Sequence, residues 1–323
     1  MGSEMCIRDS HRHHQFPQNG DSAISLQPFV ASPQNTRGHQ FSYSAKGPRL
    51  MVESSRQIAR QAVPPVAAET PRLVLVRLSL QADDNECDRL RQFLSGPERE
   101  RSQRRVVAVR RRAVVSRGRL RMLLGQVLGM PPAAVPLETN AHGKPFLAGP
   151  QDWGCQFNMS HTGDEGLIAL ATDQPVGVDL ECRKPSHTAD WARLMAGTIL
   201  GDAELSRWQA QPHGQQAMAV LDAWVAKEAI FKAIGTGIGD RLRQCELPVS
   251  MPRVVAKDGE PSGDCQLASV ALPVNLDGSE TCFGVTLIDL ESGCHAAVAL
   301  PAKRASVVLT SFDRVLREGL SLA

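Results

Sequence analysis

The chain has 323 residues, is 42% hydrophobic and 22% charged, and carries a formal net charge of +2 at pH 7. That length is sufficient for a sizeable core and for two domains, and no apolar run approaches the ~18 residues that a transmembrane helix needs. The eight cysteines never form a Cys-x-x-Cys pair, which argues against a zinc site or a disulfide framework. We therefore expect reduced, mostly buried thiols, a cytoplasmic location and no membrane partner.

Residues 1–70 differ in composition from the rest of the chain. They are rich in Ser, Gln, Pro and His and have few sustained apolar runs, which is typical of a disordered leader. They contain no apolar segment of the kind found in a signal peptide, so we do not expect secretion. Serines and arginines with few acids between Gly38 and Arg60 leave an organelle transit peptide open as an alternative.

The first predicted elements after the leader are a strand at residues 73–78 and a basic helical region at residues 98–121. This helical region contains ten arginines against Glu98 and Glu100, with apolar residues at roughly helical intervals. A solvated arginine face accounts for most of them, and nucleic-acid binding is the usual functional alternative. Arginine also suits phosphate, because its planar fork binds phosphate oxygens in pairs.

Two segments with polar groups follow the basic region. In residues 142–146, a glycine turn and an extended residue before proline would hold Lys144 out of the path of the chain. In residues 157–161, Ser160 and His161 end an apolar stretch and would offer hydroxyl and imidazole donors to phosphate oxygens. Adjacent residues of a strand point to opposite faces, so this pair is a poor candidate for a nucleophile and its base.

Strands are next predicted at residues 166–171 and 176–181, with a turn between them that opens the second half of the chain. Asp179 and Glu181 are two residues apart in the second strand, so they point to the same face. Two adjacent carboxylates repel one another unless a cation neutralises them, and hard oxygen ligands suit Mg²⁺. Taken alone, the segment also fits a half-exposed strand with solvated acids.

Helices are predicted at residues 191–209 and 215–234. Near the end of the second helix, Glu228 and Lys232 share one face with Trp224, and Lys227 lies beside them. Alternatively, Glu228 and Lys232 form only an i, i+4 ion pair that stabilises the helix, and the glycines that follow only end it. Because Mg²⁺ commonly takes one or two carboxylates together with substrate phosphate oxygens, the acidic strand and this helix favour a metal and diphosphate site.

The remainder of the chain completes the predicted layout. We expect an irregular excursion at residues 248–280 and strands at 283–287 and 296–300, so that each half runs from a strand through helices to further strands. We divide the chain into a leader at 1–70, an N-terminal half at 71–175, a C-terminal half at 176–301 and a tail at 302–323.

Four motifs in this order resemble those of the 4'-phosphopantetheinyl transferases, specifically the larger single-chain type that activates peptide and polyketide synthetases. The likeness runs from about residue 71 to about residue 300, and the motif in the second predicted helix is the most specific. The matching residues are Gly143-Lys144-Pro145, Phe157-Asn158-x-Ser160-His161, Gly177-Val178-Asp179-x-Glu181 and Trp224-x-x-Lys227-Glu228-Ala229-x-x-Lys232-x-x-Gly235-x-Gly237. The resemblance implies an α+β fold of two similar halves, related by a pseudo-twofold axis, with the active site between them.

The resemblance also implies an activity, namely transfer of the 4'-phosphopantetheine group of coenzyme A to a serine of an apo acyl or peptidyl carrier protein, with release of 3',5'-ADP. Asp179, Glu181 and Glu228 would hold Mg²⁺ with the coenzyme A diphosphate, and Glu228 or a metal-adjacent water would help to deprotonate the serine. Lys232 would meet the diphosphate as the second catalytic residue. The other implied coenzyme A contacts are Arg112, Arg121, Gly143, Lys144, Pro145, Ser160, His161 and Lys227. Such an enzyme serves fatty acid, polyketide or nonribosomal peptide biosynthesis, and we expect a monomer without a nucleic-acid partner.

Two other functional classes remain open at this level. A metal-dependent phosphohydrolase or nuclease would also use clustered carboxylates and a basic surface, but it would release phosphate or nucleotides without a carrier protein. A nucleic-acid-binding module would rest on the arginine-rich helices alone and would bind with a steep salt dependence. The chain also departs slightly from the family pattern, with Thr162 where Ser is frequent and His295 where an aromatic is common.

Overall fold

The computed structural model describes residues 72–149, 153–255, 261–273, 280–290, 293–320 and 322. The predicted leader lies outside these residues. In chain order the elements are β1 (Arg72–Ser79), α1 (Asp84–Phe93), α2 (Gly96–Gln103), α3 (Val107–Leu128), η1 (Pro132–Ala134), β2 (Leu137–Thr139), β3 (Pro145–Leu147), β4 (Gln156–Thr162), β5 (Glu165–Ala171), β6 (Gly177–Cys182), α4 (Ala189–Ile199), α5 (Asp202–Gln209), α6 (His213–Ile234), η2 (Gly239–Gln244), β7 (Arg253–Val255), β8 (Pro261–Gln266), β9 (Ala268–Pro273), β10 (Glu280–Asp289), β11 (Cys294–Leu300), β12 (Arg304–Ser311) and α7 (Phe312–Glu318).

The first sheet has the strand order β4-β5-β1-β12-β8. Strand β1 is buried on both faces, since successive side chains alternate across a strand. Val74 and Val76 pack with Leu123 and Leu124 of α3, whereas Leu73 on the opposite face belongs to a different core cluster. The long helix α3 therefore covers only one face of this sheet.

The second sheet has the strand order β6-β11-β10-β7, with β9 also paired to β10. Small side chains on one face, such as Ala297 and Ala299, pack against α6. On the other face, Val178 and Val298 join the cluster that contains Leu73 of the first sheet. The two sheets thus share one apolar layer and carry their helices on their outer faces.

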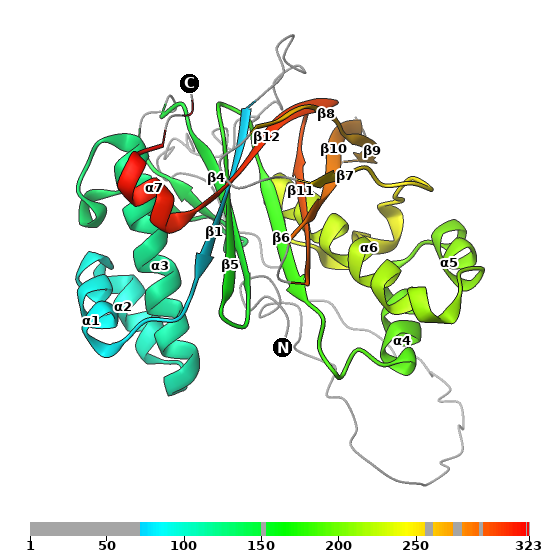
Figure 1. Ribbon diagram of the computed structural model, residues 1–323, viewed down its shortest axis with the longest axis horizontal. Coiled ribbons are helices and arrows are strands. Elements are labelled where there is room, and N and C mark those ends of the chain that lie inside the picture. The colour runs from blue at the N-terminus through cyan, green and yellow to red at the C-terminus, as the bar shows by residue number, and fades with distance from the viewer. Residues whose placement is uncertain are drawn as a thin grey trace, which may run out of the picture. The chain divides into compact units, whose positions relative to one another are not determined.

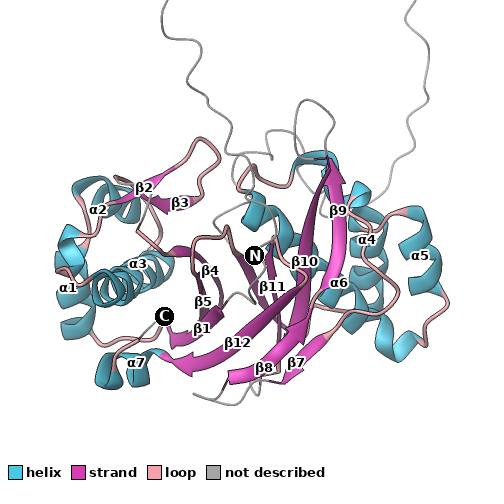
Figure 2. Cartoon of the chain, turned by 90° about the horizontal axis from the view of Figure 1, so that it is seen from above, coloured by secondary structure: helices cyan, strands magenta, loops and turns pink. Residues whose placement is uncertain are grey.

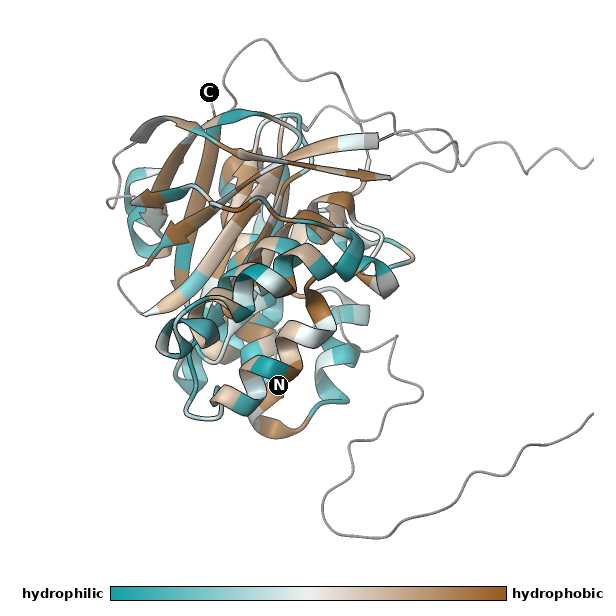
Figure 3. Cartoon of the chain, turned by 90° about the vertical axis from the view of Figure 1, so that its right-hand side faces the viewer, coloured by the Kyte–Doolittle hydropathy of each residue, from teal (hydrophilic) through white to brown (hydrophobic). Residues whose placement is uncertain are grey.

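Figures 1 and 2 show this arrangement, with α1, α2, α3 and α7 on one side of the strands and α4, α5 and α6 on the other. In Figure 3 the hydrophobic colour is concentrated in the strands, while hydrophilic residues are frequent on the helices. The predicted α+β class and its two halves are confirmed. Among the described helices, none combines the length and the apolar character that crossing a bilayer requires.

The C-terminal segments are more regular than their sequence predicts. Residues 302–323, which are predicted to form a tail, contain β12 and α7, and β12 lies between β1 and β8. It forms a strand because Ala305, Val307 and Leu309 alternate into the core between the sheets. The stretch taken as an irregular excursion contains β7, β8 and β9, and β8 crosses into the first sheet.

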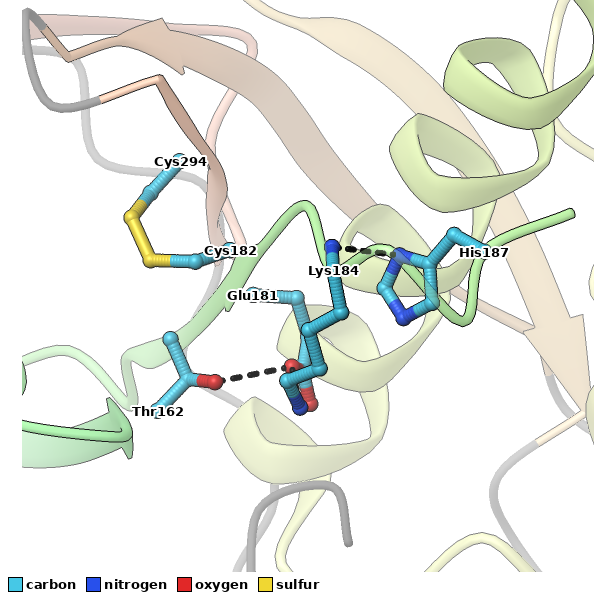
Figure 4. The surroundings of a disulfide bond; sticks show 6 residues. All are labelled: Thr162, Glu181, Cys182, Lys184, His187 and Cys294. Atoms are coloured by element: carbon cyan, nitrogen blue, oxygen red, sulfur yellow. Dashed lines mark hydrogen bonds and ion pairs between the residues drawn. A yellow bond between two sulfur atoms is a disulfide. The ribbon is translucent and has the colours of Figure 1, made fainter.

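The expectation of reduced thiols throughout the chain is wrong for one pair. Cys182 and Cys294 form a disulfide between β6 and β11, as Figure 4 shows. These two residues are direct partners in the antiparallel register, and a sequence separation of 112 residues conceals that proximity. Among the described free thiols, Cys155 and Cys245 are buried as expected, and burial raises the pKa of each to about 12.

Candidate active site

The close approach of α6 to β6 forms the centre of the site. A Cβ atom at Gly177 would overlap the backbone of Ala229 and Ala233, so only glycine permits this packing. Val178 and Leu180 enter the core between the sheets. The alternating positions of β6 therefore face α6, and they are the acidic ones.

Alternate residues of β4 tie that strand to β6, an edge strand of the other sheet. The Asn158 side chain accepts a hydrogen bond from the Val178 backbone N–H at 2.9 Å. Two residues further along, the Ser160 hydroxyl donates to Asp179 at 2.8 Å. The Thr162 hydroxyl donates to Glu181 at 3.1 Å, as Figure 4 shows. This series of contacts fixes both acidic side chains of β6 against the first sheet.

Helix α6 adds Glu228 and Lys232 to the acidic side chains of β6. The Lys232 Nζ atom lies 2.5 Å from Asp179 Oδ1 and 3.8 Å from Glu228 Oε2, and it donates to Ser160 Oγ at 3.1 Å. Asp179 and Glu228 are both completely buried, and Lys232 is also buried. The structure therefore brings together residues from three of the four sequence motifs.

The Glu228 carboxyl has an altered proton affinity. Burial raises the pKa of this carboxyl to about 8, with Asp179 and Glu181 adding to the rise and the Lys232 ammonium opposing it. Neither Glu228 oxygen has a hydrogen-bond partner among the described residues. A carboxyl that titrates near neutral pH can accept or release a proton under physiological conditions.

The oxygen atoms in this cluster fit a hard divalent cation. Asp179 Oδ2 and both Glu228 oxygens are buried without hydrogen-bond donors in the described part of the chain, and such oxygens are typical Mg²⁺ ligands. However, no three His, Cys, Asp or Glu side chains within the described ranges are arranged so that they could hold one ion. The reason is visible in the contacts: Lys232 lies against Asp179, and Glu181 instead contacts Thr162 and Lys184.

A pocket lies beside the cluster and joins it to the Gly-Lys-Pro loop. The loop is held by Asn140, whose side chain donates to the Gly235 carbonyl at 3.0 Å and accepts from the Lys144 backbone. Lys144 Nζ donates to the Ala233 carbonyl at 3.0 Å. The pocket is lined by His142, Gly143, Lys144, Pro145, Asn158, Met159, Phe231, Lys232, Gly235, Gly237 and Ile238.

Lys227, a coenzyme A contact implied by the family resemblance, lies elsewhere. Its Nζ atom is completely buried and donates to Glu204 at 2.6 Å, to the Ile199 carbonyl at 2.7 Å and to the Leu242 carbonyl at 2.9 Å. These three bonds use all the donors of an ammonium group. Lys227 thus anchors α6 to α4, α5 and η2, on a different side of the helix from Glu228.

Arg112 and Arg121, which the resemblance implies as coenzyme A contacts, have separate partners within the protein. Arg121 is 2% exposed and bonds to Glu98 at 2.8 Å and to the Val135 carbonyl at 2.9 Å, so its guanidinium is used within the protein core. Arg112 is partly exposed and pairs with Asp164 at 2.7 Å. Of the other expected contacts, Ser160 is buried in the acidic cluster and His161 is half-buried on β4.

Three polar residues that position this site have no role predicted from the sequence. Asn158 and Thr162 connect β4 to β6, and Asn140 fixes the loop that carries Lys144. The available signal was the run of polar residues at every second position of β4, which predicts that they share one face. Which strand they would meet was not visible from that spacing.

Comparisons with known proteins agree with the site. The family model described as the 4'-phosphopantetheinyl transferase superfamily matches residues 175–259, and the model of the 4'-phosphopantetheinyl transferase N-terminal domain matches residues 81–174. The chain is 32% identical over 178 residues to the 4'-phosphopantetheinyl transferase HetI of Nostoc sp., covering 54% of this chain and 73% of that protein. The chain belongs to the 4'-phosphopantetheinyl transferase superfamily.

Two further relatives have the same kind of name. The L-aminoadipate-semialdehyde dehydrogenase-phosphopantetheinyl transferase of Xenopus laevis is 29% identical over 198 residues, which cover 58% of this chain and 61% of that protein. The 4'-phosphopantetheinyl transferase AcpT of Salmonella typhimurium is 31% identical over 155 residues, which cover 48% of this chain and 72% of that protein. Similarity thus extends to bacterial and animal members of the superfamily.

Proposed function

We propose that this chain transfers the 4'-phosphopantetheine group of coenzyme A to a serine of an apo acyl or peptidyl carrier protein. The observation that carries the proposal is the meeting of the Gly-Lys-Pro loop, Asn158 and the end of α6 at one pocket, with the buried carboxylates beside it. Lysines and backbone amides suit a diphosphate, and buried carboxylates suit the metal that accompanies it. The names of the relatives support the same reaction.

In the proposed reaction, the serine oxygen bonds to the phosphorus that carries pantetheine. The bond from that phosphorus to the bridging oxygen breaks, and 3',5'-ADP leaves with the bridging oxygen. The serine proton passes to Glu228, a buried carboxyl whose two oxygens have no hydrogen-bond donor among the described residues. Lys232 and Lys144 lie on the pocket wall, where their charges would offset those of the diphosphate.

Asp179 and Glu228 would hold Mg²⁺ through their buried oxygens that lack donors, and Glu181 would join them by leaving its contacts with Thr162 and Lys184. The ion would supply charge neutralisation at the diphosphate as the leaving group departs. Ser160 would orient the Asp179 carboxylate through the hydrogen bond described above. Gly143 and Pro145 would shape the wall that faces the nucleotide.

Mass spectrometry of an apo carrier domain tests the proposal. With Mg²⁺ and coenzyme A, the purified chain should add ~340 Da to the carrier serine, the mass of one phosphopantetheine group. Glu228→Gln should abolish this shift while circular dichroism shows a folded protein. An unchanged carrier mass across a panel of acyl and peptidyl carriers, with folded enzyme, would contradict the proposed transfer.

A further inference from the structure

The position of the Lys232 ammonium suggests a second role for this residue. Its Nζ atom is within 4 Å of both carboxylates that have unpartnered oxygens, at 2.5 Å from Asp179 and 3.8 Å from Glu228. The Ser160 hydroxyl bridges the same atoms, because it donates to Asp179 at 2.8 Å and accepts from Lys232 at 3.1 Å. Lys232 is therefore the cation that this cluster holds in the structure.

The contact between Lys232 and Asp179 explains why this site has suitable metal ligands that are not arranged around one ion. The carboxylate oxygens fit a divalent cation, yet the acids are not arranged to hold one among the described residues. The buried Asp179 carboxylate requires a neutralising charge, and an ammonium can provide it as well as a metal can. Two cations that compete for the same oxygens repel one another, so both cannot occupy their closest positions together.

We propose that Lys232 is an exchangeable internal cation, which neutralises Asp179 next to Glu228 before substrates bind and gives way to a divalent ion when coenzyme A arrives. The inference rests on the proposed function, since that function brings the metal and the diphosphate to this cluster. A metal ion without coenzyme A would have to displace the ammonium and leave it buried without a counter-charge. Metal binding is therefore weak alone and strong in the presence of the diphosphate.

The side chain has a suitable destination for this movement. Lys232 lines the pocket that also contains Lys144 and the glycines at the end of α6, so its side chain already borders the space where the diphosphate would bind. A lysine has a flexible four-carbon stem, which permits such a change at low cost. The arriving diphosphate supplies a new anionic partner for the ammonium at the moment when it leaves Asp179. Metal and coenzyme A should then strengthen each other's binding, as linkage requires.

Binding of Mn²⁺, a paramagnetic substitute for Mg²⁺, tests the proposal without any measurement of transfer. Electron paramagnetic resonance of free Mn²⁺ gives the metal affinity of the full chain with and without coenzyme A. In the wild type, coenzyme A should increase the Mn²⁺ affinity at least about tenfold. In Lys232→Met, Mn²⁺ alone should bind at least about tenfold more tightly than to the wild type, and the gain from coenzyme A should shrink.

Arg241→Met is the matched control, because it removes one positive charge close to α6. Its guanidinium contacts Thr236, the Gly237 carbonyl and the Phe231 ring. This variant should bind Mn²⁺ alone as weakly as the wild type does. Lys232→Gln provides the same test if Lys232→Met fails to fold, and Lys232→Arg, which keeps the charge, should resemble the wild type.

The outcomes separate the two proposals. If coenzyme A promotes Mn²⁺ binding to the wild type but neither neutral Lys232 variant binds Mn²⁺ alone more tightly, the exchange is wrong and the proposed function is unaffected. If the wild type binds no Mn²⁺ even with coenzyme A, both the exchange and the metal role in the proposed function are wrong. An equal gain in Arg241→Met would show a general charge effect and would also overturn the exchange.

Discussion

Gly177 of β6 lies directly against Ala229 of α6, with no room for a side chain between the strand and the helix. Gly177→Ala should therefore push α6 away from β6 and separate Glu228 and Lys232 from Asp179. We expect a loss of about 1–3 kcal/mol in the free energy of unfolding, as for other overpacked cores. The transfer rate should also fall, at least about tenfold, because catalytic geometry tolerates little displacement.

Urea denaturation and the carrier mass shift measure these two effects. Gly214→Ala is the control on the same helix, since a Cβ atom there meets no atom within 4 Å. This control should leave both stability and transfer close to those of the wild type. Equal behaviour of the two variants would show that the contact at Gly177 does not position the site.

Lys227 provides a prediction about stability. Lys227→Met should leave the Glu204 carboxylate buried without its ammonium partner, at a cost of about 3–5 kcal/mol in the free energy of unfolding. The double variant Lys227→Met/Glu204→Gln should recover part of this loss, because no buried charge remains. Denaturation curves of the wild type, the two single variants and the double variant measure the coupling. A coupling energy near zero would contradict the buried pair.

The disulfide provides a prediction about redox state. Because Cys182–Cys294 closes a loop with a sequence separation of 112 residues, its reduction should lower the free energy of unfolding by about 2–4 kcal/mol. Non-reducing peptide mapping should recover one linked peptide that contains both cysteines. A reductant should lower the urea midpoint of the wild type and leave that of Cys182→Ser/Cys294→Ser unchanged. The same decrease in both proteins would show that the effect of the reductant does not come from this disulfide.

Glu228 provides a prediction about pH. Its pKa is raised from the ordinary 4.5 to about 8 by burial and by the neighbouring acids, so the folded state favours the protonated carboxyl. In metal-free buffer, the wild type should therefore lose stability as the pH rises from about 4.5 to about 8, by an amount on the order of 1–4 kcal/mol. Glu228→Gln has no such proton to release and should lack this loss. Parallel pH dependence of the two proteins in thermal denaturation would contradict the raised pKa.

Much of the site follows from local periodicity. The two-residue period of a strand correctly places Asp179 and Glu181 on one face, and the helical period correctly pairs Glu228 with Lys232. Periodicity predicts which face of a strand or helix carries a residue. It does not predict which other element packs against that face. Lys227, one position from Glu228, turned out to face α4 and α5 instead of the pocket.

The arginine pair illustrates the same limit more strongly. Arg112 and Arg121 are both in α3, and nine residues make about two and a half helical turns, so the two side chains leave the helix on opposite faces. That argument was available from the sequence once the helix was known to be continuous. The partner of Arg121, the Glu98 carboxylate, belongs to a different helix and could not be inferred from spacing.

The contacts that were least predictable join distant parts of the chain. The disulfide and the pairing of β1 with β12 connect residues that no local pattern relates. The segment from Arg304 to Ser311 has the alternation of a strand, but only the fold shows that its place is beside β1. Strand composition predicts that a segment is extended and leaves its partner open.

The position of β12 has a consequence for protein synthesis. The first sheet is completed by a strand that is synthesised after all the other described strands, so one edge of β1 stays uncovered until β12 is made. A nascent chain that stops before Arg304 would expose that edge, and β8 would also lack its neighbour. Premature termination should therefore yield an aggregation-prone fragment rather than a stable half-enzyme.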